Sequence, residues 1–165
     1  MSDNEKRNTM NRILNTISGT LLALCILSSC TKEPAAVTMN NDFVGDWHLA
    51  ELEYDGSIMD NPIDVYLTIN SDCTFELYMK NELQSRYTKF TGTCRLEGGI
   101  LSGTYSSGTE WGDAYEASVE GDMLVLVSSD LIETQRFESG SLSDDEKKNA
   151  DISTKSSPDG IIPVL

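Results

Sequence analysis

Apolar and polar residues alternate along the middle of the chain. Residues 63–69 read Ile-Asp-Val-Tyr-Leu-Thr-Ile, and residues 73–79 read Cys-Thr-Phe-Glu-Leu-Tyr-Met. A period of two places successive side chains on opposite faces of a strand, so each segment predicts a β-strand with one apolar face. Extending this interpretation, we expect strands at roughly 45–54, 63–69, 73–79, 86–96, 100–106, 114–120, 122–128 and 131–138.

Short turn sequences separate these segments, and no stretch between them has a helical period. The turns are Asp55-Gly56, Asn70-Ser71-Asp72, Glu97-Gly98-Gly99, Gly112-Asp113, Gly121-Asp122 and Ser129-Asp130. Eight short strands at this spacing indicate an antiparallel meander, and closure into a barrel would remove its exposed edges. The predicted fold is therefore all-β: an eight-stranded antiparallel barrel over residues 43–139.

The N-terminal segment has the layout of a secretory signal. Residues 1–12 are polar and contain three basic side chains, whereas residues 13–29 carry no charge and have an apolar centre at 21–27. This combination is typical of a signal peptide, and the apolar stretch is short for a transmembrane helix. Met10 is an alternative to Met1 as the start, because it would give a shorter basic region.

Leu27-Ser28-Ser29-Cys30 resembles the bacterial lipobox, in which small residues separate a branched apolar residue from a cysteine. The resemblance implies that the signal peptide spans 1–29 and that Cys30 becomes the lipid-modified first residue; the alternative is an unmodified leader cysteine. Cys25 fits less well, because the large side chain of Leu24 precedes it. Two or more acyl chains anchor a protein stably. With Thr31 and no Asp after the cysteine, the resemblance implies a cell-envelope lipoprotein of the outer membrane, facing the periplasm or the surface.

The segments that flank the predicted barrel are polar. Residues 30–42 are short and contain Pro and Ala, which is typical of a tether. Residues 140–165 begin with a charged, Ser-rich stretch without periodicity, and we expect a disordered acidic tail there.

The chain is strongly acidic, with a formal net charge of −15. Such a surface repels the phosphates of nucleic acid and anionic lipid headgroups, so neither is an expected partner. A solvated surface and a specific acidic binding face both remain compatible with this charge.

Gly45-Asp46-Trp47, at the start of the first strand, resembles the Gly-x-Trp signature of lipocalins and related calycin barrels. The wider chain resembles the lipocalin-like domains of lipoproteins from Bacteroides-type bacteria. The segments that carry this resemblance are 44–49, 90–94, 101–105 and 133–137, which together span most of the predicted barrel. It implies that Trp47 fills the barrel floor, that Gly45 permits close packing beneath it, and that Arg136 packs over the indole as a cation. The strands and loops are shorter than those of a full lipocalin.

Cys73 and Cys94 are the two thiols expected in the domain after lipidation. A hairpin that turns around Gln84 and pairs Lys80 with Tyr87 also places Cys73 opposite Cys94. Directly opposed residues have Cβ atoms about 4.5–5.5 Å apart, and an exported protein meets oxidising conditions. We expect a disulfide; two buried thiols in the barrel wall are the alternative.

The sequence offers little catalytic or metal-binding chemistry. His48 is the single histidine, and it should point outward if Trp47 points inward. The serines cluster in turns and in the tail without the context of a nucleophile elbow. One histidine without a Cys-x-x-Cys motif supplies no metal-ligand set. We expect a protein that is not an enzyme and has no metal or cofactor.

Two functions follow from this interpretation, both for a monomer. The first is a binding protein that takes a small apolar ligand inside the barrel. The second is a protein-interaction module, such as an inhibitor or a surface accessory subunit, with a filled barrel and no small-molecule ligand. An internal cavity would favour the first, and an exposed aromatic patch would favour the second.

Overall fold

The computed structural model of the chain describes residues 38–60, 63–153 and 165. The predicted signal peptide (1–29), Cys30 and the tether up to residue 37 lie outside the described residues.

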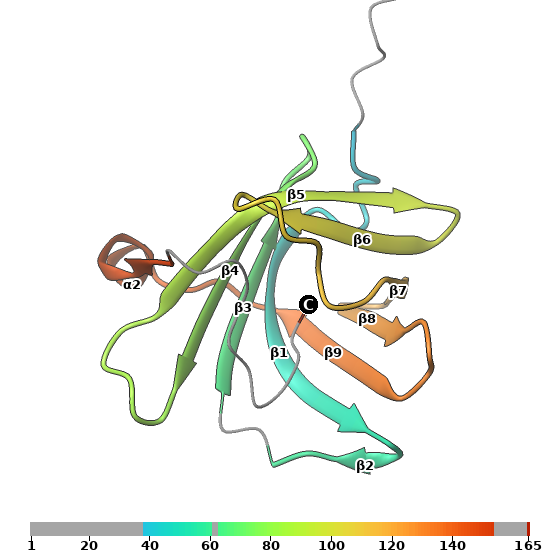
Figure 1. The fold of residues 1–165 in the computed structure, drawn as a ribbon, viewed down its shortest axis with the longest axis horizontal. Helices are drawn as coiled ribbons and strands as arrows, with labels where there is room; N and C mark the ends of the chain where they lie inside the picture. The colour runs from blue at the N-terminus through green and yellow to red at the C-terminus, as the bar shows by residue number, and fades with distance from the viewer. Residues whose placement is uncertain (1–37, 61–62, 154–164) are drawn as a thin grey trace, which may run out of the picture. The chain divides into compact units, whose positions relative to one another are not determined.

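The described chain is built almost entirely of strands (Figure 1). The elements are β1 (Gly45–Tyr54), β2 (Ser57–Ile58), β3 (Ile63–Ile69), β4 (Thr74–Asn81), β5 (Thr88–Glu97), β6 (Ile100–Tyr105), β7 (Tyr115–Glu120), β8 (Met123–Ser128), β9 (Glu133–Ser139), α2 (Asp144–Asn149) and β10 (Asp151–Ile152). The eight predicted strands are confirmed as β1 and β3–β9. The short β2, α2 and β10 were not predicted.

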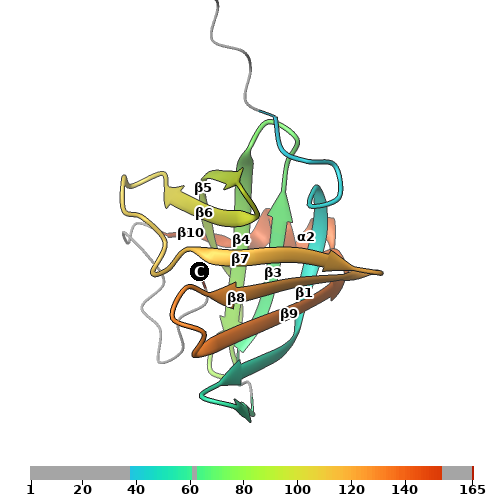
Figure 2. The same cartoon turned by 90° about the vertical axis from the view of Figure 1, so that its right-hand side faces the viewer.

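The eight long strands close into an antiparallel barrel (Figures 1 and 2). Each strand pairs with the next along the chain, and β9 returns to pair with β1, from Trp47↔Ser139 to Tyr54↔Glu133. The β6–β7 pairing is short, with only Ile100↔Glu116 and Leu101↔Tyr115 in register. Of the pairings that close the barrel, the one between β6 and β7 therefore has the fewest paired residues.

Burial follows the predicted alternation. On β3, Val65, Leu67 and Ile69 are buried, and the residues between them are half-exposed. Inward side chains from all eight strands meet in one core, where complete burial of each large apolar side chain contributes about 1.5–3 kcal/mol.

β1 contains an irregularity that changes which of its residues face inward. Trp47 and Leu49 are buried, the pairing with β9 shifts between Leu49 and Glu51, and Leu52 is the next buried residue. An extra residue in one strand of an antiparallel pair bends that strand and increases its twist.

The expectation of a disordered tail from residue 140 is wrong for residues 140–153. Ser143 caps α2: its hydroxyl accepts from the Glu146 backbone N–H at 3.3 Å and donates to the Glu146 carboxylate at 2.8 Å. Ser-x-x-Glu is the sequence signature of a capping box, a local signal that composition does not register. β10 then pairs in parallel with the start of β5. Residues 154–164 lie outside the described residues.

Leu142 fixes this segment to the outside of the barrel. It is buried against Tyr78 and Tyr87, on the outward side of β4 and at the start of β5. The apolar contact explains why a polar, charged segment follows the barrel wall.

We predict that Leu142→Ala lowers the free energy of unfolding by about 2–3 kcal/mol, as expected when a buried leucine is truncated, and accelerates amide exchange over residues 143–152. Urea unfolding and hydrogen–deuterium exchange measure the two effects. Leu83→Ala is the matched control, because Leu83 is 97% exposed in the β4–β5 turn. Equal effects of the two substitutions would contradict docking through Leu142.

Candidate binding site

The barrel interior contains a chain of aromatic rings. Phe75 of β4 lies at its centre, with ring centroids 5.6 Å from Tyr105 and 5.1 Å from Trp111, both edge-on. Trp111 continues to Tyr115, at the start of β7, with a centroid distance of 6.5 Å. We call these four residues the interior aromatic cluster. Edge-to-face packing of this kind contributes about 0.5–1.5 kcal/mol for each pair beyond the area it buries.

Trp111 reaches the interior because Gly103 leaves space for it. The backbone N–H of Trp111 donates to the Gly103 carbonyl at 2.9 Å, and a Cβ at position 103 would overlap the indole. Trp111 Nε1 is buried without a hydrogen-bond partner. The same ring lines an outer cleft of about 750 Å³ between β5, β6 and residues 110–114. Trp111 therefore stands between this cleft and the barrel interior, beside the short β6–β7 pairing.

A group of polar side chains is buried around Tyr115, at one end of the aromatic cluster. Gln135 of β9 donates from Nε2 to Glu133 Oε1 and, at 3.4 Å, to the hydroxyl of Tyr115. The Ser128 hydroxyl accepts from the Glu133 backbone N–H at 2.9 Å. All four residues are buried, and we call them the interior polar cluster. Gln135 Oε1 has no hydrogen-bond partner there.

Burial dominates the acid–base behaviour of this cluster. Desolvation raises the pKa of Glu133 above its ordinary value, and the carboxylates of Asp113 and Asp130 add to the shift, although Gln135 and Tyr115 oppose it as hydrogen-bond donors. Burial, and then the nearby Glu133 charge, also raises the pKa of Tyr115. The interior thus holds a carboxyl group that loses its proton less readily than one in water.

Leu165, at the C mark, lies amid the barrel strands in Figure 1 and beside the ends of β7 and β8 in Figure 2. It is 4% exposed and packs in the main core. The hydroxyl of Tyr105 donates to its backbone carbonyl at 2.9 Å. Part of the interior is therefore filled by a residue that none of the barrel strands supplies.

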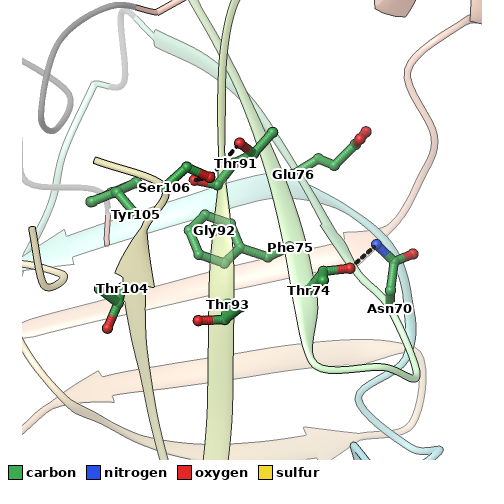
Figure 3. Close-up of a pocket in the computed structure, with 10 residues that line it drawn as sticks. All are labelled: Asn70, Thr74, Phe75, Glu76, Thr91, Gly92, Thr93, Thr104, Tyr105 and Ser106. Atoms are coloured by element: carbon green, nitrogen blue, oxygen red, sulfur yellow. Dashed lines mark hydrogen bonds between the residues drawn. The ribbon is translucent and has the colours of Figure 1, made fainter. Parts of the chain in front are cut away.

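A smaller cleft of about 340 Å³ lies where β4, β5 and β6 meet (Figure 3). Thr91 and Ser106 share a hydrogen bond of 2.8 Å there, and Asn70 donates to Thr74 at 3.0 Å. Gly92 is sterically required at this point, because a Cβ would overlap the Thr104 carbonyl and the Phe75 ring. Since these polar side chains already pair with one another, the cleft offers a ligand fewer unpaired hydrogen-bonding groups than the interior does.

Trp47 is buried in the core near the entry of the chain into the barrel, and its Nε1 donates to the Phe43 carbonyl at 3.1 Å. Gly45 does not have the steric role that the resemblance implied. A Cβ at position 45 would meet the indole of Trp47 at 3.7 Å, which is an ordinary contact. The close approaches that do require glycine occur at Gly92 and Gly103 instead.

The expected packing of Arg136 over Trp47 is wrong. Gln135 and Phe137 are buried on the inner face of β9, so the period of two turns Arg136 outward. Its Nη1 pairs with Glu51 at 2.7 Å and with Glu53 at 3.2 Å, both on β1. Arg136 therefore links β9 to β1 on the outside of the barrel.

The register expected for Cys73 and Cys94 is confirmed, but the structure has buried thiols there and not a disulfide. The Cys94 backbone N–H donates to the Cys73 carbonyl at 2.8 Å, so the two residues oppose each other across the β4–β5 hairpin. Burial raises the pKa of Cys94 to about 12, which keeps its thiol protonated and unreactive at neutral pH. The geometry matches the alternative of two thiols in the barrel wall.

His48 points outward, as expected from the inward position of Trp47. Its Nε2 lies 2.9 Å from Asp64 and its Nδ1 lies 3.3 Å from Glu138, while its ring stacks on Tyr66 with centroids 4.4 Å apart. These contacts tie β1 to β3 and β9. Within 38–60, 63–153 and 165, no three His, Cys, Asp or Glu side chains gather as metal ligands would.

No helix among the described residues has the length and apolar character needed to cross a membrane.

A family model described as a lipocalin-like domain matches residues 43–126. Among solved structures, the chain is similar to an uncharacterized protein from Bacteroides eggerthii DSM 20697, with 18% identity and a TM-score of 0.46 over 59% of this chain and 99% of that one. It is also similar to the lipoprotein YedD from Klebsiella pneumoniae subsp. pneumoniae MGH 78578, with 14% identity and a TM-score of 0.43 over 68% of this chain and 85% of that one. A search of curated proteins finds no match.

We predict that Glu133→Gln melts at a higher temperature than the wild type at pH 8, and that the gap closes as the pH falls toward 4. Because the folded-state pKa of Glu133 is raised, the folded protein favours the protonated carboxyl, and the stability it contributes is lost as the pH rises through that pKa. A permanently neutral amide escapes this loss. Thermal unfolding across pH measures the gap, with the exposed Glu120→Gln as the control for the substitution itself. A gap that widened on acidification would contradict the prediction.

Proposed function

We propose that this chain, which belongs to the lipocalin-like domain family, is a lipid-anchored binding protein that takes a small apolar molecule inside its barrel. The barrel fold suits a binding role, because its inward side chains gather in one apolar core. The proposal involves no catalytic step and treats the protein as a monomer.

The position of Leu165 carries this proposal. Its side chain lies in the core, and its carbonyl accepts a hydrogen bond from Tyr105, 60 residues away in sequence. The interior thus accommodates an apolar group together with a polar one, and neither belongs to a strand of the barrel. A small apolar ligand with one polar group matches this environment.

The cleft beside Trp111 supports a route to the interior. Its volume of about 750 Å³ exceeds the roughly 300 Å³ of the smallest usual ligand sites. Trp111 forms its inner side next to the two residue pairs that join β6 to β7. Movement of one indole there would open a path while the longer strand pairings remained intact.

The protein-interaction module remains the second candidate, and an exposed apolar patch favours it. Tyr54, Ile58, Met59, Leu131 and Ile132 are exposed at one end of the barrel, on the β1–β2 hairpin and the β8–β9 turn. The two turns are joined by a hydrogen bond of 2.8 Å from the Asp55 N–H to the Ile132 carbonyl. Exposed apolar patches of this kind mark many protein–protein contacts.

We expect Leu165→Gly to bind the neutral fluorescent probe N-phenyl-1-naphthylamine about tenfold more tightly than the wild type. In the wild type the probe must displace the Leu165 side chain, whose burial is worth about 1.5–3 kcal/mol, and the variant lacks that side chain. Fluorescence titration of the purified protein gives both dissociation constants. Ile152→Gly removes an apolar side chain that is 79% exposed and is the matched control. If circular dichroism shows folded protein and neither the wild type nor Leu165→Gly binds the probe, the ligand-binding proposal fails and the protein-interaction module becomes the better candidate.

The proposed anchor rests on Leu27-Ser28-Ser29-Cys30, which lies outside the described residues. Two or more acyl chains on Cys30 would hold the barrel at the membrane, and outer-membrane placement follows from the Thr at position 31. Repulsion between the acidic domain and anionic headgroups would keep the barrel from lying flat on the bilayer.

Cys30→Ser is expected to abolish lipid attachment and to move the protein out of the outer-membrane fraction, because a hydroxyl cannot form the thioether. Mass spectrometry of the N-terminal peptide and membrane fractionation measure the two effects. Cys25→Ser should leave both unchanged. Unaltered lipidation of Cys30→Ser would place the anchor elsewhere.

A further inference from the structure

The interior polar cluster has an acceptor that no residue within 38–60, 63–153 and 165 pairs with. Gln135 Oε1 is fully buried without a partner, whereas Nε2 of the same amide is held by Glu133 and Tyr115. These two bonds fix the orientation of the amide, because a flip would place two acceptors, the amide oxygen and Glu133 Oε1, against each other. A buried acceptor left unpaired costs about 1–3 kcal/mol, so a partner that donates a hydrogen bond would be stabilising here.

The charge around this acceptor favours a cation over an anion. Glu133 is buried beside Gln135, and the carboxylates of Asp113 and Asp130 both act on it electrostatically as like charges. Among the ion pairs of the described residues, none involves Glu133. A ligand carboxylate would have to approach this uncompensated carboxyl in a poorly solvated interior, whereas an ammonium group would neutralise it.

The surroundings of the polar cluster suit the rest of such a molecule. The aromatic cluster begins at Tyr115, which belongs to both groups, and continues through Trp111 and Phe75 toward Tyr105 and Leu165. The faces of these rings also attract a cation. An apolar chain that took the place of Leu165 would therefore adjoin these rings, with its head group directed toward Gln135 and Glu133.

We propose that the barrel interior selects apolar molecules whose head group donates hydrogen bonds, primary amines above alcohols and both above carboxylates, with Gln135 Oε1 as the acceptor and Glu133 as the counter-charge. This inference rests on the proposed function, since it specifies which ligands the same interior binds. Gln135 Oε1 accepts a hydrogen bond from either an amine or an alcohol, whereas the charge of Glu133 favours the amine alone.

The test compares three ligands of equal chain length, octylamine, 1-octanol and octanoate, as competitors of N-phenyl-1-naphthylamine at pH 7, on the wild type and on Leu165→Gly. Octylamine should displace the probe at a concentration about tenfold below that of 1-octanol, because hydrogen bonds to charged groups contribute about 1.5–3 kcal/mol. Octanoate should be the weakest of the three.

Two variants separate the roles of the residues. Glu133→Gln should remove the preference for amine over alcohol, whereas Gln135→Leu, of similar shape, should weaken amine and alcohol alike. Glu120→Gln, on the exposed side of β7, should leave the order of the three ligands unchanged.

Equal displacement by all three ligands would overturn the inference and leave the proposed function standing. Displacement led by octanoate, or an amine preference that survives in Glu133→Gln, would overturn it as well. An unchanged response of Gln135→Leu would mean that water, and not a ligand, pairs with Gln135 Oε1. Failure of the probe to bind either the wild type or Leu165→Gly would instead reject the proposed function.

Discussion

Backbone hydrogen bonds between β1 and β9 connect the first and the last long strands of the domain, from Trp47↔Ser139 to Tyr54↔Glu133. A sheet of eight strands without this pairing would expose two long edges to water and to other chains. The pairing also fixes which side of every strand faces inward, because side chains alternate strictly along a strand. The burial of Trp47, the outward position of Arg136 and the filling of the interior all follow from it.

A closed barrel of this size must be filled, and the protein fills it unevenly. Large rings from β4, β6, β7 and the β6–β7 connection lie in the core, and Gly92 and Gly103 lack the Cβ atoms that would overlap Phe75 and Trp111. Leu165 occupies a further part. Two inward positions on β9, Glu133 and Gln135, are polar, and the incomplete hydrogen bonding of Gln135 is a cost to the fold, of the kind that proteins often retain at binding sites.

The outer face is organised by charge. Arg136 joins Glu51 and Glu53 across the β1–β9 pairing, and His48 connects Asp64 with Glu138. These pairs are partly exposed and contribute modestly to stability, but they occur where β1 meets its two neighbours. Leu142 packs against Tyr78 and Tyr87 on the outer face, where the three side chains form a small apolar cluster separate from the barrel core.

Local signals in the sequence were sufficient for the strands, their turns, the antiparallel order and the facing of Cys73 and Cys94, because a period of two and a hairpin register depend on neighbouring residues alone. The capping box at Ser143 and Glu146 was equally local, and a search for it would have found α2. The tertiary structure decided the rest. Arg136 turned outward because β9 places Gln135 and Phe137 inside. Cys73 and Cys94 face each other as buried thiols. The meeting of Tyr115, Gln135, Trp111 and Leu165 in one interior was set by barrel closure, which brings together residues far apart in the sequence that no local pattern relates.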